Sequence, residues 1–291
     1  MVAPPRPKMP GLNSLRAFES AARLESFADA AAELSVTPGA IAQQIKSLEA
    51  WTGKKLFKRL PQGIELTVLG AGTLADFTTA FDALGEAEIK LRANAAPQEI
   101  RIAALPSIAQ LWLSPKLPDL RSAMPDILIS LAALEVPPIM KRDPYDLAVF
   151  YATQPDSGGL INVSNDWIFP VCSPEIASKL GRPQDILDHV LLHDTTWSDD
   201  WKNWFHQFLP NERPQVSGSA FSLYSLAVEE AKNSAGILMG HSTLVREQLD
   251  CGDLVMPFDC RLDNKQILTI EVASHGVNTP YLQKIVDSLS K

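Results

Sequence analysis

The sequence predicts an α+β multidomain protein with a small helical head, one long helix and a larger α/β body. Apolar residues recur at helical spacing within residues 1–66, and a heptad-like seam runs through 67–95. Short β-branched runs then alternate with helical patterns over 96–291, as expected for an α/β domain. Because 291 residues suffice for two or three domains, we expect these ranges to be its structural divisions.

Charge is distributed unevenly along the chain. The formal net charge is −8, yet residues 1–66 hold nine Lys/Arg and six Asp/Glu and therefore carry +3. The remaining residues carry −11. A basic head on an acidic body suits a nucleic-acid partner at one end only.

The composition also indicates where the protein resides. No apolar run approaches the roughly 20 residues needed to span a membrane, and the proline-rich N-terminal segment lacks the apolar stretch of a signal peptide. The three cysteines have no zinc-type spacing and are expected to be reduced thiols. We therefore expect a cytoplasmic protein with no membrane partner.

The N-terminal pattern predicts three helices. The first begins near Leu12, and Ser26 is a suitable N-cap for the second. The chain breaks around Ser35, after which Thr37 caps a third helix. Pro38 occupies the first position of that helix, where a missing N–H costs nothing. Two short helices joined by a tight turn after a first helix constitute a helix-turn-helix.

The third helix has two contrasting faces. Ile41, Ile45 and Leu48 share one side and should pack on the first two helices. The opposite side is small and polar and consists of Gly39, Gln43, Lys46 and Ser47. Glutamine can read a base edge, while lysine or serine can contact phosphate, so this face suits the DNA major groove. The alternative is an ordinary solvated helix face.

A basic β-hairpin is predicted after the third helix. Two short apolar segments flank a turn at residues 61–63, which is typical of a wing. Lys54, Lys55, Lys58 and Arg59 place four positive charges at its base, where they would contact the phosphate backbone and make the affinity salt-dependent.

Residues 15–59 resemble the DNA-binding domain of the LysR family of transcription regulators. The shared features, in order, are Phe18, Ser26-Phe27, Leu34, Thr37, Ile45, Leu48-Glu49, Gly53, Leu56-Phe57 and Arg59. Because the sequence departs from the family pattern at Pro38, Gly39 and Ala42, we expect base reading to rest on Gln43 and Gln44. The predicted DNA-binding residues are Ser35, Thr37, Pro38, Gly39, Gln43, Gln44, Lys46, Ser47, Lys54, Lys55, Lys58 and Arg59.

The long helix predicted from Thr67 to Asn94 carries an apolar seam. The seam consists of Leu74, Phe77, Phe81, Leu84 and Leu91, with Glu88 as an imperfection. A second copy of the helix would bury this seam; the alternative is that it packs on its own body domain. The resemblance favours a homodimer through this helix, and a homotetramer beyond it.

Six strands are expected in the body, which should form mainly parallel sheets with ligands outside their carboxyl ends. They are Ile100–Leu105, Ile127–Leu131, Asp146–Phe150, Trp167–Cys172, Gly236–Met239 and Leu268–Ala273.

The resemblance continues through the body. Pro125-Asp126-Ile127, Asp146-Leu147-Ala148, residues 191–194 and residues 252–258 match the effector-binding domain of LysR regulators. They are most similar to the subgroup that includes glycine-cleavage activators. The resemblance implies two lobes like those of periplasmic binding proteins, with a small-molecule effector in the cleft. Lobe I is expected at about 97–165 and 269–291, and lobe II at about 166–268.

Ser107 leads the predicted effector site. It opens a helix after the first strand of the body, where its hydroxyl and free N–H groups could hold a carboxylate; the alternative is a simple helix cap. We therefore expect a small anionic effector, either a carboxylate or an amino-acid-like molecule. The predicted effector-binding residues are Pro106, Ser107, Phe150, Tyr151, Ser222, Tyr224, His241 and Ser242.

An enzyme is the main alternative class of function. Gly240-His241-Ser242 resembles a nucleophile elbow, but Leu244 occupies the position where G-x-S-x-G requires glycine. There is no P-loop or G-x-G-x-x-G, and neither His193-Asp194 nor His206 has metal-ligand spacing. The sequence therefore predicts no catalysis, no metal and no cofactor.

Two further classes of protein are alternatives to an effector-controlled regulator. A secreted solute-binding protein fits the body but not the N-terminal helices. A thiol-based redox sensor would use Cys172, Cys251 or Cys260, although only Arg261 beside Cys260 offers a basic neighbour. We therefore expect a regulator whose partners are operator DNA and an effector, with RNA polymerase as a further candidate.

Overall fold

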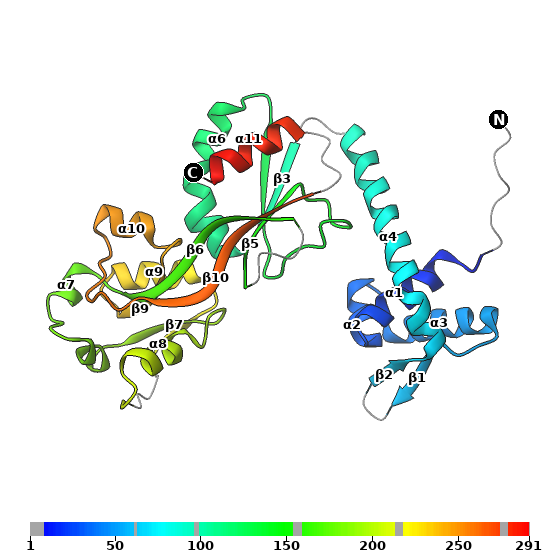
Figure 1. The fold of residues 1–291 in the computed structure, drawn as a ribbon, viewed down its shortest axis with the longest axis horizontal. Coiled ribbons are helices and arrows are strands. Elements are labelled where there is room, and N and C mark those ends of the chain that lie inside the picture. Colours follow the sequence, from blue (N-terminus) through cyan, green and yellow to red (C-terminus); the bar gives the residue numbers. More distant parts are fainter. Residues whose placement is uncertain are drawn as a thin grey trace. The chain divides into compact units, whose positions relative to one another are not determined.

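The computed structural model describes residues 9–60, 63–95, 99–153, 159–212, 218–273 and 279–290. The chain divides into two compact units, residues 1–88 and 89–291 (Figure 1). Each unit has its own hydrophobic core.

Local capping explains where the helices of the N-terminal unit begin and end. The Ser26 hydroxyl accepts a hydrogen bond from Asp29 N (3.1 Å), and the Thr37 hydroxyl accepts one from Ala40 N (3.2 Å), as predicted. Gly53 ends the third helix with φ of 67°, in the left-handed region that favours glycine. The helices are α1 (Leu12–Arg23), α2 (Phe27–Glu33), α3 (Pro38–Thr52) and α4 (Val68–Ala95).

The predicted wing is an antiparallel hairpin of β1 (Phe57–Leu60) and β2 (Gly63–Leu66). Pro61 and Gln62 of the predicted turn lie outside the described residues. Phe18 is fully buried at the centre of the unit, with its ring 5.7 Å from that of Phe57 and 5.5 Å from that of Phe77. The wing and α4 therefore share one core with the three helices.

Part of the predicted apolar seam on α4 is covered by residues of its own unit. Leu74, Phe77 and Phe81 pack against the core of their own unit. Leu84 and Leu91 are 50% and 71% exposed. The N-terminal half of the predicted seam is thus already partly covered within one chain, whereas its C-terminal half remains uncovered.

The described part of the C-terminal unit contains one eight-stranded sheet with the order β4-β3-β5-β10-β6-β9-β7-β8. The six predicted strands are present, and β7 and β8 join them. The strands are β3 (Glu99–Ala104), β4 (Leu128–Ala133), β5 (Leu147–Ala152), β6 (Leu160–Val171), β7 (Leu191–Asp194), β8 (Ala220–Phe221), β9 (Ile237–His241) and β10 (Leu262–Val272).

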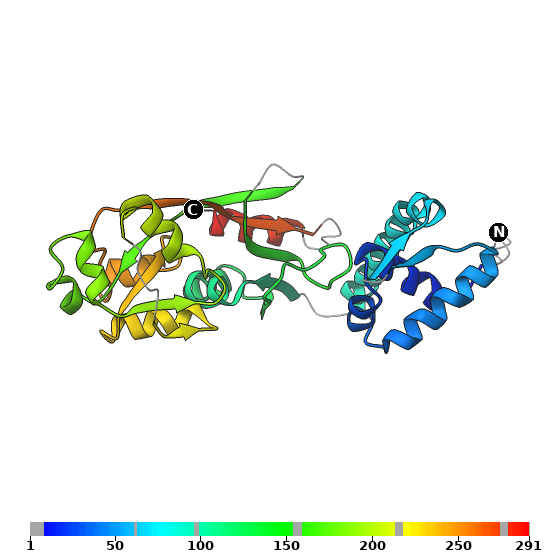
Figure 2. The same cartoon turned by 90° about the horizontal axis from the view of Figure 1, so that it is seen from below.

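The sheet is mixed, with four parallel and three antiparallel pairings among the described strands, so the prediction of mainly parallel pairing holds by a small margin. Strands β3, β4 and β5 pair in parallel, as do β7, β8 and β9. The pairs of β10 with β5, β10 with β6 and β6 with β9 are antiparallel. The reason is that β6 and β10 are longer than predicted and run side by side from one lobe into the other (Figures 1 and 2).

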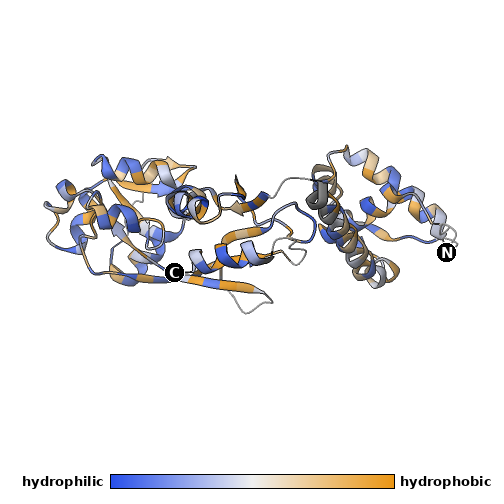
Figure 3. Cartoon of the chain, turned by 90° about the horizontal axis from the view of Figure 1, so that it is seen from above, coloured by the Kyte–Doolittle hydropathy of each residue, from blue (hydrophilic) through white to orange (hydrophobic). Residues whose placement is uncertain are grey.

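Helices cover both faces of this sheet in lobe II. One face packs against α9 and the residues flanking α10, and the other packs against α8, with Trp204 fully buried. The strands are largely hydrophobic in Figure 3, whereas the helices around them mix both characters. The helices are α5 (Pro106–Ile108), α6 (Leu117–Ala123), α7 (Pro174–Ala177), α8 (Asp200–Phe208), α9 (Tyr224–Lys232), α10 (Arg246–Cys251) and α11 (Thr279–Leu289).

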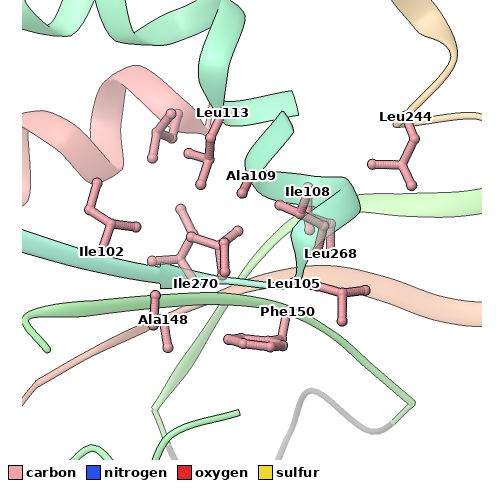
Figure 4. Packing of buried hydrophobic residues seen from close by; sticks show 14 of the residues in the cluster. Ile102, Leu105, Ile108, Ala109, Leu113, Ala148, Phe150, Leu244, Leu268 and Ile270 are labelled. Carbon is pink, nitrogen blue, oxygen red and sulfur yellow. The ribbon is translucent and has the colours of Figure 1, made fainter. Parts of the chain in front are cut away.

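The largest core is continuous from lobe I into lobe II. Ile108 and Ala109 lie over β10 close to Leu268 and Ile270 (Figure 4). Leu244, which follows β9 in lobe II, belongs to the same buried cluster. The two lobes therefore share packed apolar contacts in addition to the strands that join them.

Candidate nucleic-acid interface and ligand-binding cleft

The polar face of α3 is solvent-exposed, as predicted. Ile41, Ile45 and Leu48 are buried against α1 and α2. The exposed residues of this segment are Ser35, Thr37, Pro38, Gly39, Gln43, Lys46 and Ser47. Thr37 also caps α3, so its hydroxyl already has a structural role.

Gln44 lies apart from that exposed face. It is half-buried, and its Oε1 accepts a hydrogen bond from the Ser14 hydroxyl at 2.6 Å. Gln44 thereby joins α3 to α1, which leaves Gln43 as the exposed glutamine of the helix. A hollow beside Gln43 separates α3 from the wing; it is lined by Phe27, Ala42, Gln43, Ile45, Lys46, Glu49, Lys55 and Phe57.

Glu49 anchors the base of the wing. Its Oε1 accepts hydrogen bonds from Leu56 N (2.9 Å) and Phe57 N (3.4 Å), and its Oε2 pairs with Lys55 Nζ at 2.6 Å. Partial burial would raise the pKa of Glu49, but these donors together hold it below its ordinary value. In the sequence, Glu49 stands out only as part of the family resemblance.

The basic residues of the wing are partly neutralised within the chain. Lys55 pairs with Glu49, and Lys58 lies 3.6 Å from Glu65 on the opposite strand. Lys54 is exposed. The side chain of Arg59 lies outside the described residues. The wing therefore offers less free positive charge than a count of its lysines suggests.

The carboxyl ends of the parallel strands gather at one edge in each lobe of the C-terminal unit, and the two edges meet. Because β3, β4 and β5 are parallel, their carboxyl ends meet at one edge of lobe I, and those of β7, β8 and β9 meet likewise in lobe II. The two edges touch where the hydroxyls of Tyr151 and Thr243 share a hydrogen bond. The Tyr151 ring also lies 6.0 Å from that of Trp197.

In lobe I, Ser107 is the residue best placed for a ligand. Its side chain is buried, and its hydroxyl has no hydrogen-bond partner among the described residues. Pro106 is half-buried beside it. Phe150, by contrast, packs in the main core, and its carbonyl oxygen accepts a hydrogen bond from Thr269 at 3.0 Å.

In lobe II, Tyr224 braces the end of β9. It begins α9, and it is buried. Its hydroxyl donates to Met239 O (2.9 Å) and accepts from His241 N (3.0 Å). Ser222 precedes α9 and is exposed. Tyr224 thus has both hydrogen bonds within the protein, while Ser222 remains accessible.

His241 forms a buried charged cluster with two aspartates. Its Nδ1 lies 2.6 Å from Asp166 Oδ2, and its Nε2 lies 3.0 Å from Asp200 Oδ2 in a less well aligned ion pair. Burial opposes a positive charge on His241, but the two carboxylates prevail and raise its pKa from 6.5 to about 9. His241 is therefore an imidazolium at neutral pH.

Asp166 connects this cluster to both lobes. Its carboxylate accepts hydrogen bonds from Ser242 Oγ (3.2 Å), Thr243 Oγ1 (3.2 Å) and Asn264 Nδ2 (2.9 Å). Through Thr243 it reaches the hydroxyl of Tyr151 in lobe I. His241, Ser242 and Tyr151 are predictable from the sequence because they follow strands, whereas no local pattern points to Asp166, Asp200, Thr243 or Asn264.

The thiols show no feature of a redox site. All three are free cysteines, with Cys172 buried and Cys251 exposed. Burial raises the pKa of Cys172 to about 11, and burial together with Asp259 raises that of Cys260. A raised thiol pKa disfavours the reactive thiolate. Nothing in the described structure therefore supports the redox alternative.

The part of the chain that the structure describes contains neither a membrane-spanning helix nor a cluster of metal-ligating side chains. Within it, every helix is too short or too polar to cross a bilayer. No group of three or more His, Cys, Asp or Glu side chains there is arranged to hold a metal ion.

A winged helix-turn-helix joined to a two-lobed cleft domain defines a class of ligand-controlled DNA-binding regulators. Residues 12–71 match the family described as bacterial regulatory helix-turn-helix protein, lysR family, and residues 93–275 match the LysR substrate binding domain. The chain belongs to the LysR family of bacterial transcription regulators, with a DNA-binding head and an effector-binding body.

Two curated relatives from Escherichia coli (strain K12) cover most of the chain. The glycine cleavage system transcriptional activator is 34% identical over 89% of this chain and 86% of its own. The HTH-type transcriptional regulator DsdC is 34% identical over 85% and 82%. The solved structure of CrgA, a LysR-type transcriptional regulator from Neisseria meningitidis, has the same fold, with a TM-score of 0.54 at 20% identity over 96% of this chain and 98% of that one.

Proposed function

We propose that this protein is a sequence-specific regulator that binds operator DNA through α3 and the wing under the control of a small-molecule effector. The observation that carries this proposal is the exposed polar face of α3, where Gln43 lies beside Lys46 and next to the wing. Such a protein acts on the bacterial chromosome, and we therefore place it in the cytoplasm.

The test compares two neighbouring glutamines. Gln43→Ala should weaken binding to the selected operator by about 5- to 100-fold, because a side chain that reads a base contributes roughly 1–3 kcal/mol, and it should leave binding to random DNA unchanged. Gln44→Ala is the matched control and should lower the thermal stability of the head without changing operator preference. Fluorescence anisotropy with both DNAs distinguishes them. Equal losses on operator and random DNA for Gln43→Ala would remove Gln43 from base reading.

We propose that α4 forms the homodimer and that homodimers associate further into homotetramers. The support is the exposure of Leu84 and Leu91, because an uncovered apolar stripe on a long helix needs a partner. Leu84→Asp should weaken the dimer, whereas a charge at Phe77 or Phe81 would also disturb the core of the head. Sedimentation velocity of the full chain that shows an unchanged dimer for Leu84→Asp would exclude this contact.

We propose that a small carboxylate or amino-acid-like effector binds in the interlobe cleft at Ser107, Tyr151 and Ser222. The support is the buried Ser107 hydroxyl without a partner, since a buried polar atom usually has one. Thermal-shift screening of the full chain should use small carboxylates and amino acids, including glycine in view of the relative's name. Binding unaffected by Ser107→Ala would place the effector elsewhere. RNA polymerase remains a candidate partner of the DNA-bound protein.

A further inference from the structure

Asp194 is a buried carboxylate with one oxygen left unpaired. It ends β7 at the cleft edge of lobe II and is 6% exposed. Its Oδ1 accepts hydrogen bonds from Thr196 N (2.7 Å) and Trp197 N (3.3 Å). Its Oδ2 is buried and has no hydrogen-bond partner among the described residues. Leaving a buried charged oxygen unpaired costs more than leaving a neutral one, so this oxygen calls for a donor.

Besides these N–H groups, the Thr196 side chain donates a hydrogen bond to the Asp194 carboxylate, and burial raises the pKa of Asp194 above its ordinary value. No described donor reaches Oδ2. His241 attracts its charge, but the two ring nitrogens of His241 are directed to Asp166 and Asp200. No described lysine or arginine forms an ion pair with Asp194. Three carboxylates therefore share one imidazolium at this end of the cleft, and the local balance is negative.

Aromatic rings gather around Trp197, whose backbone N–H binds the other oxygen of Asp194. Trp197 follows Asp194 by three residues, and its ring lies 4.0 Å from His241, 5.2 Å from Tyr224 and 6.0 Å from Tyr151. The faces of tryptophan and tyrosine attract cations. A carboxylate bound by the backbone of a residue in an aromatic cluster is a chemical environment that suits an ammonium group and disfavours an anion.

The opposite lobe holds a second unpaired polar group. Ser107 follows β3, whose last residues pair with β5 just before Tyr151, and Tyr151 contacts Trp197 and Thr243 of lobe II. The Ser107 hydroxyl is buried without a partner. Because a hydroxyl both donates and accepts, it can bind a carboxylate or hydroxyl at the other end of a short molecule.

We propose that the effector carries a primary ammonium group bound by Asp194, with Ser107 binding its other polar end. The effector is then an α-amino acid or a similarly small zwitterion, and not a simple carboxylate. This inference rests on the proposed effector cleft and narrows its ligand to one chemical class. It also assigns a ligand-binding role to Asp194, which the sequence places only in the family resemblance of residues 191–194 and beside a histidine without metal-ligand spacing.

The experiment measures full-length protein by thermal shift and calorimetry with matched sets of compounds. The amine-bearing set is glycine and both enantiomers of alanine, serine and threonine. The first comparison set is the corresponding 2-hydroxy acids, such as glycolate, lactate and glycerate, and the second is the N-acetyl amino acids. Each compound keeps the carboxylate. The hydroxy acids replace the ammonium group with a neutral hydroxyl, and the N-acetyl compounds replace it with a neutral but bulkier amide.

The variants are Asp194→Asn, Ser107→Ala and the control Asp199→Asn. Asparagine keeps an oxygen for the two backbone N–H groups and removes the charge, so the domain should fold and unfold at a temperature equal to or above that of the wild type. Asp199 is 73% exposed and pairs only with exposed Lys202, so its variant should bind like the wild type. We expect at least one amino acid to bind, its hydroxy and acetyl counterparts not to bind, and Asp194→Asn to weaken binding about 10- to 100-fold.

Two results would overturn the proposal, and they are distinguishable. A hydroxy acid or acetyl compound that binds as well as the amino acid, through Ser107 but independently of Asp194, would refute the ammonium site and leave the effector cleft standing. No binding by any compound of the three sets would count against both the ammonium site and the cleft. Operator binding by the same preparations tests the DNA-binding function independently of either result.

Discussion

The two units place their functional polar groups in opposite surroundings. In the N-terminal unit, Gln43, Lys46 and Ser47 lie on the outside of α3, while the apolar residues of the same helix form the core. In the C-terminal unit, Asp166 and His241 are fully buried, and both are held by side chains from other elements. Exposed polar groups interact weakly through screened charges, whereas buried ones cost much free energy when a partner is lost. Substitutions in the head should therefore alter binding, and substitutions in the cleft should alter stability as well.

The largest expected effect is the loss of Asp166. Asp166→Ala should lower the free energy of unfolding by about 3–5 kcal/mol, because it leaves the buried imidazolium with one carboxylate and removes the acceptor of several hydrogen bonds. Denaturant unfolding measures the change. Asp188→Ala is the control, since Asp188 is exposed. If both variants lose the same small amount, the cluster contributes no more than a surface residue.

The pH dependence of stability tests the charge of His241. The pKa is about 9 in the folded protein and near 6.5 when unfolded, so the folded state binds the proton more tightly. The stabilisation is complete below about pH 6.5 and is lost as the pH rises through 9, which amounts to a few kcal/mol. Urea unfolding of the wild type at pH 6, 8 and 9.5 should show a decline that His241→Gln lacks. The control His206→Gln, at an exposed site on α8, should retain it.

The smallest expected effect is in the wing. Glu65→Gln releases Lys58 from its 3.6 Å ion pair and should raise DNA affinity about two- to fivefold. One more phosphate contact should steepen the salt dependence by a slope of about one. Glu33→Gln offers a comparison, because Glu33 pairs with Arg23 between α1 and α2. Anisotropy titrations at several salt concentrations measure both values, and an unchanged slope for Glu65→Gln would mean that Lys58 does not reach phosphate.

The same contrast explains how far the sequence could predict each region. The caps at Ser26 and Thr37 and the turn at Gly53 depend on residues within a few positions, so local patterns find them. The pair of His241 and Asp166 joins residues 75 positions apart, and no local pattern connects them. Buried polar clusters form only when distant strands pair, which requires the fold.

The extent of β6 and β10 was underestimated for a related reason. Residues 162–165 and 263–266 are mostly polar, so they lack the apolar run by which strands were recognised. Both stretches lie where the chain crosses between lobes, and their residues are exposed or half-buried. β10 also has a register shift after Asp263, next to Lys265 with φ of 57°. Their strand structure comes from hydrogen bonds to neighbouring strands and not from burial.

The same two crossing strands determine the mechanics of the effector domain. Flexible linkers would let the lobes swing freely, but β6 and β10 are hydrogen-bonded to each other along most of their length, from lobe I into lobe II. Any change in the angle between the lobes must twist this pair of strands. Their hydrogen bonds oppose that twist. The irregular stretch from Asp263 to Ile267, with Lys265 in the left-handed region, is its most compliant point. An effector bound between the lobes, as proposed, would have to supply the free energy of this twist before the lobes could rotate.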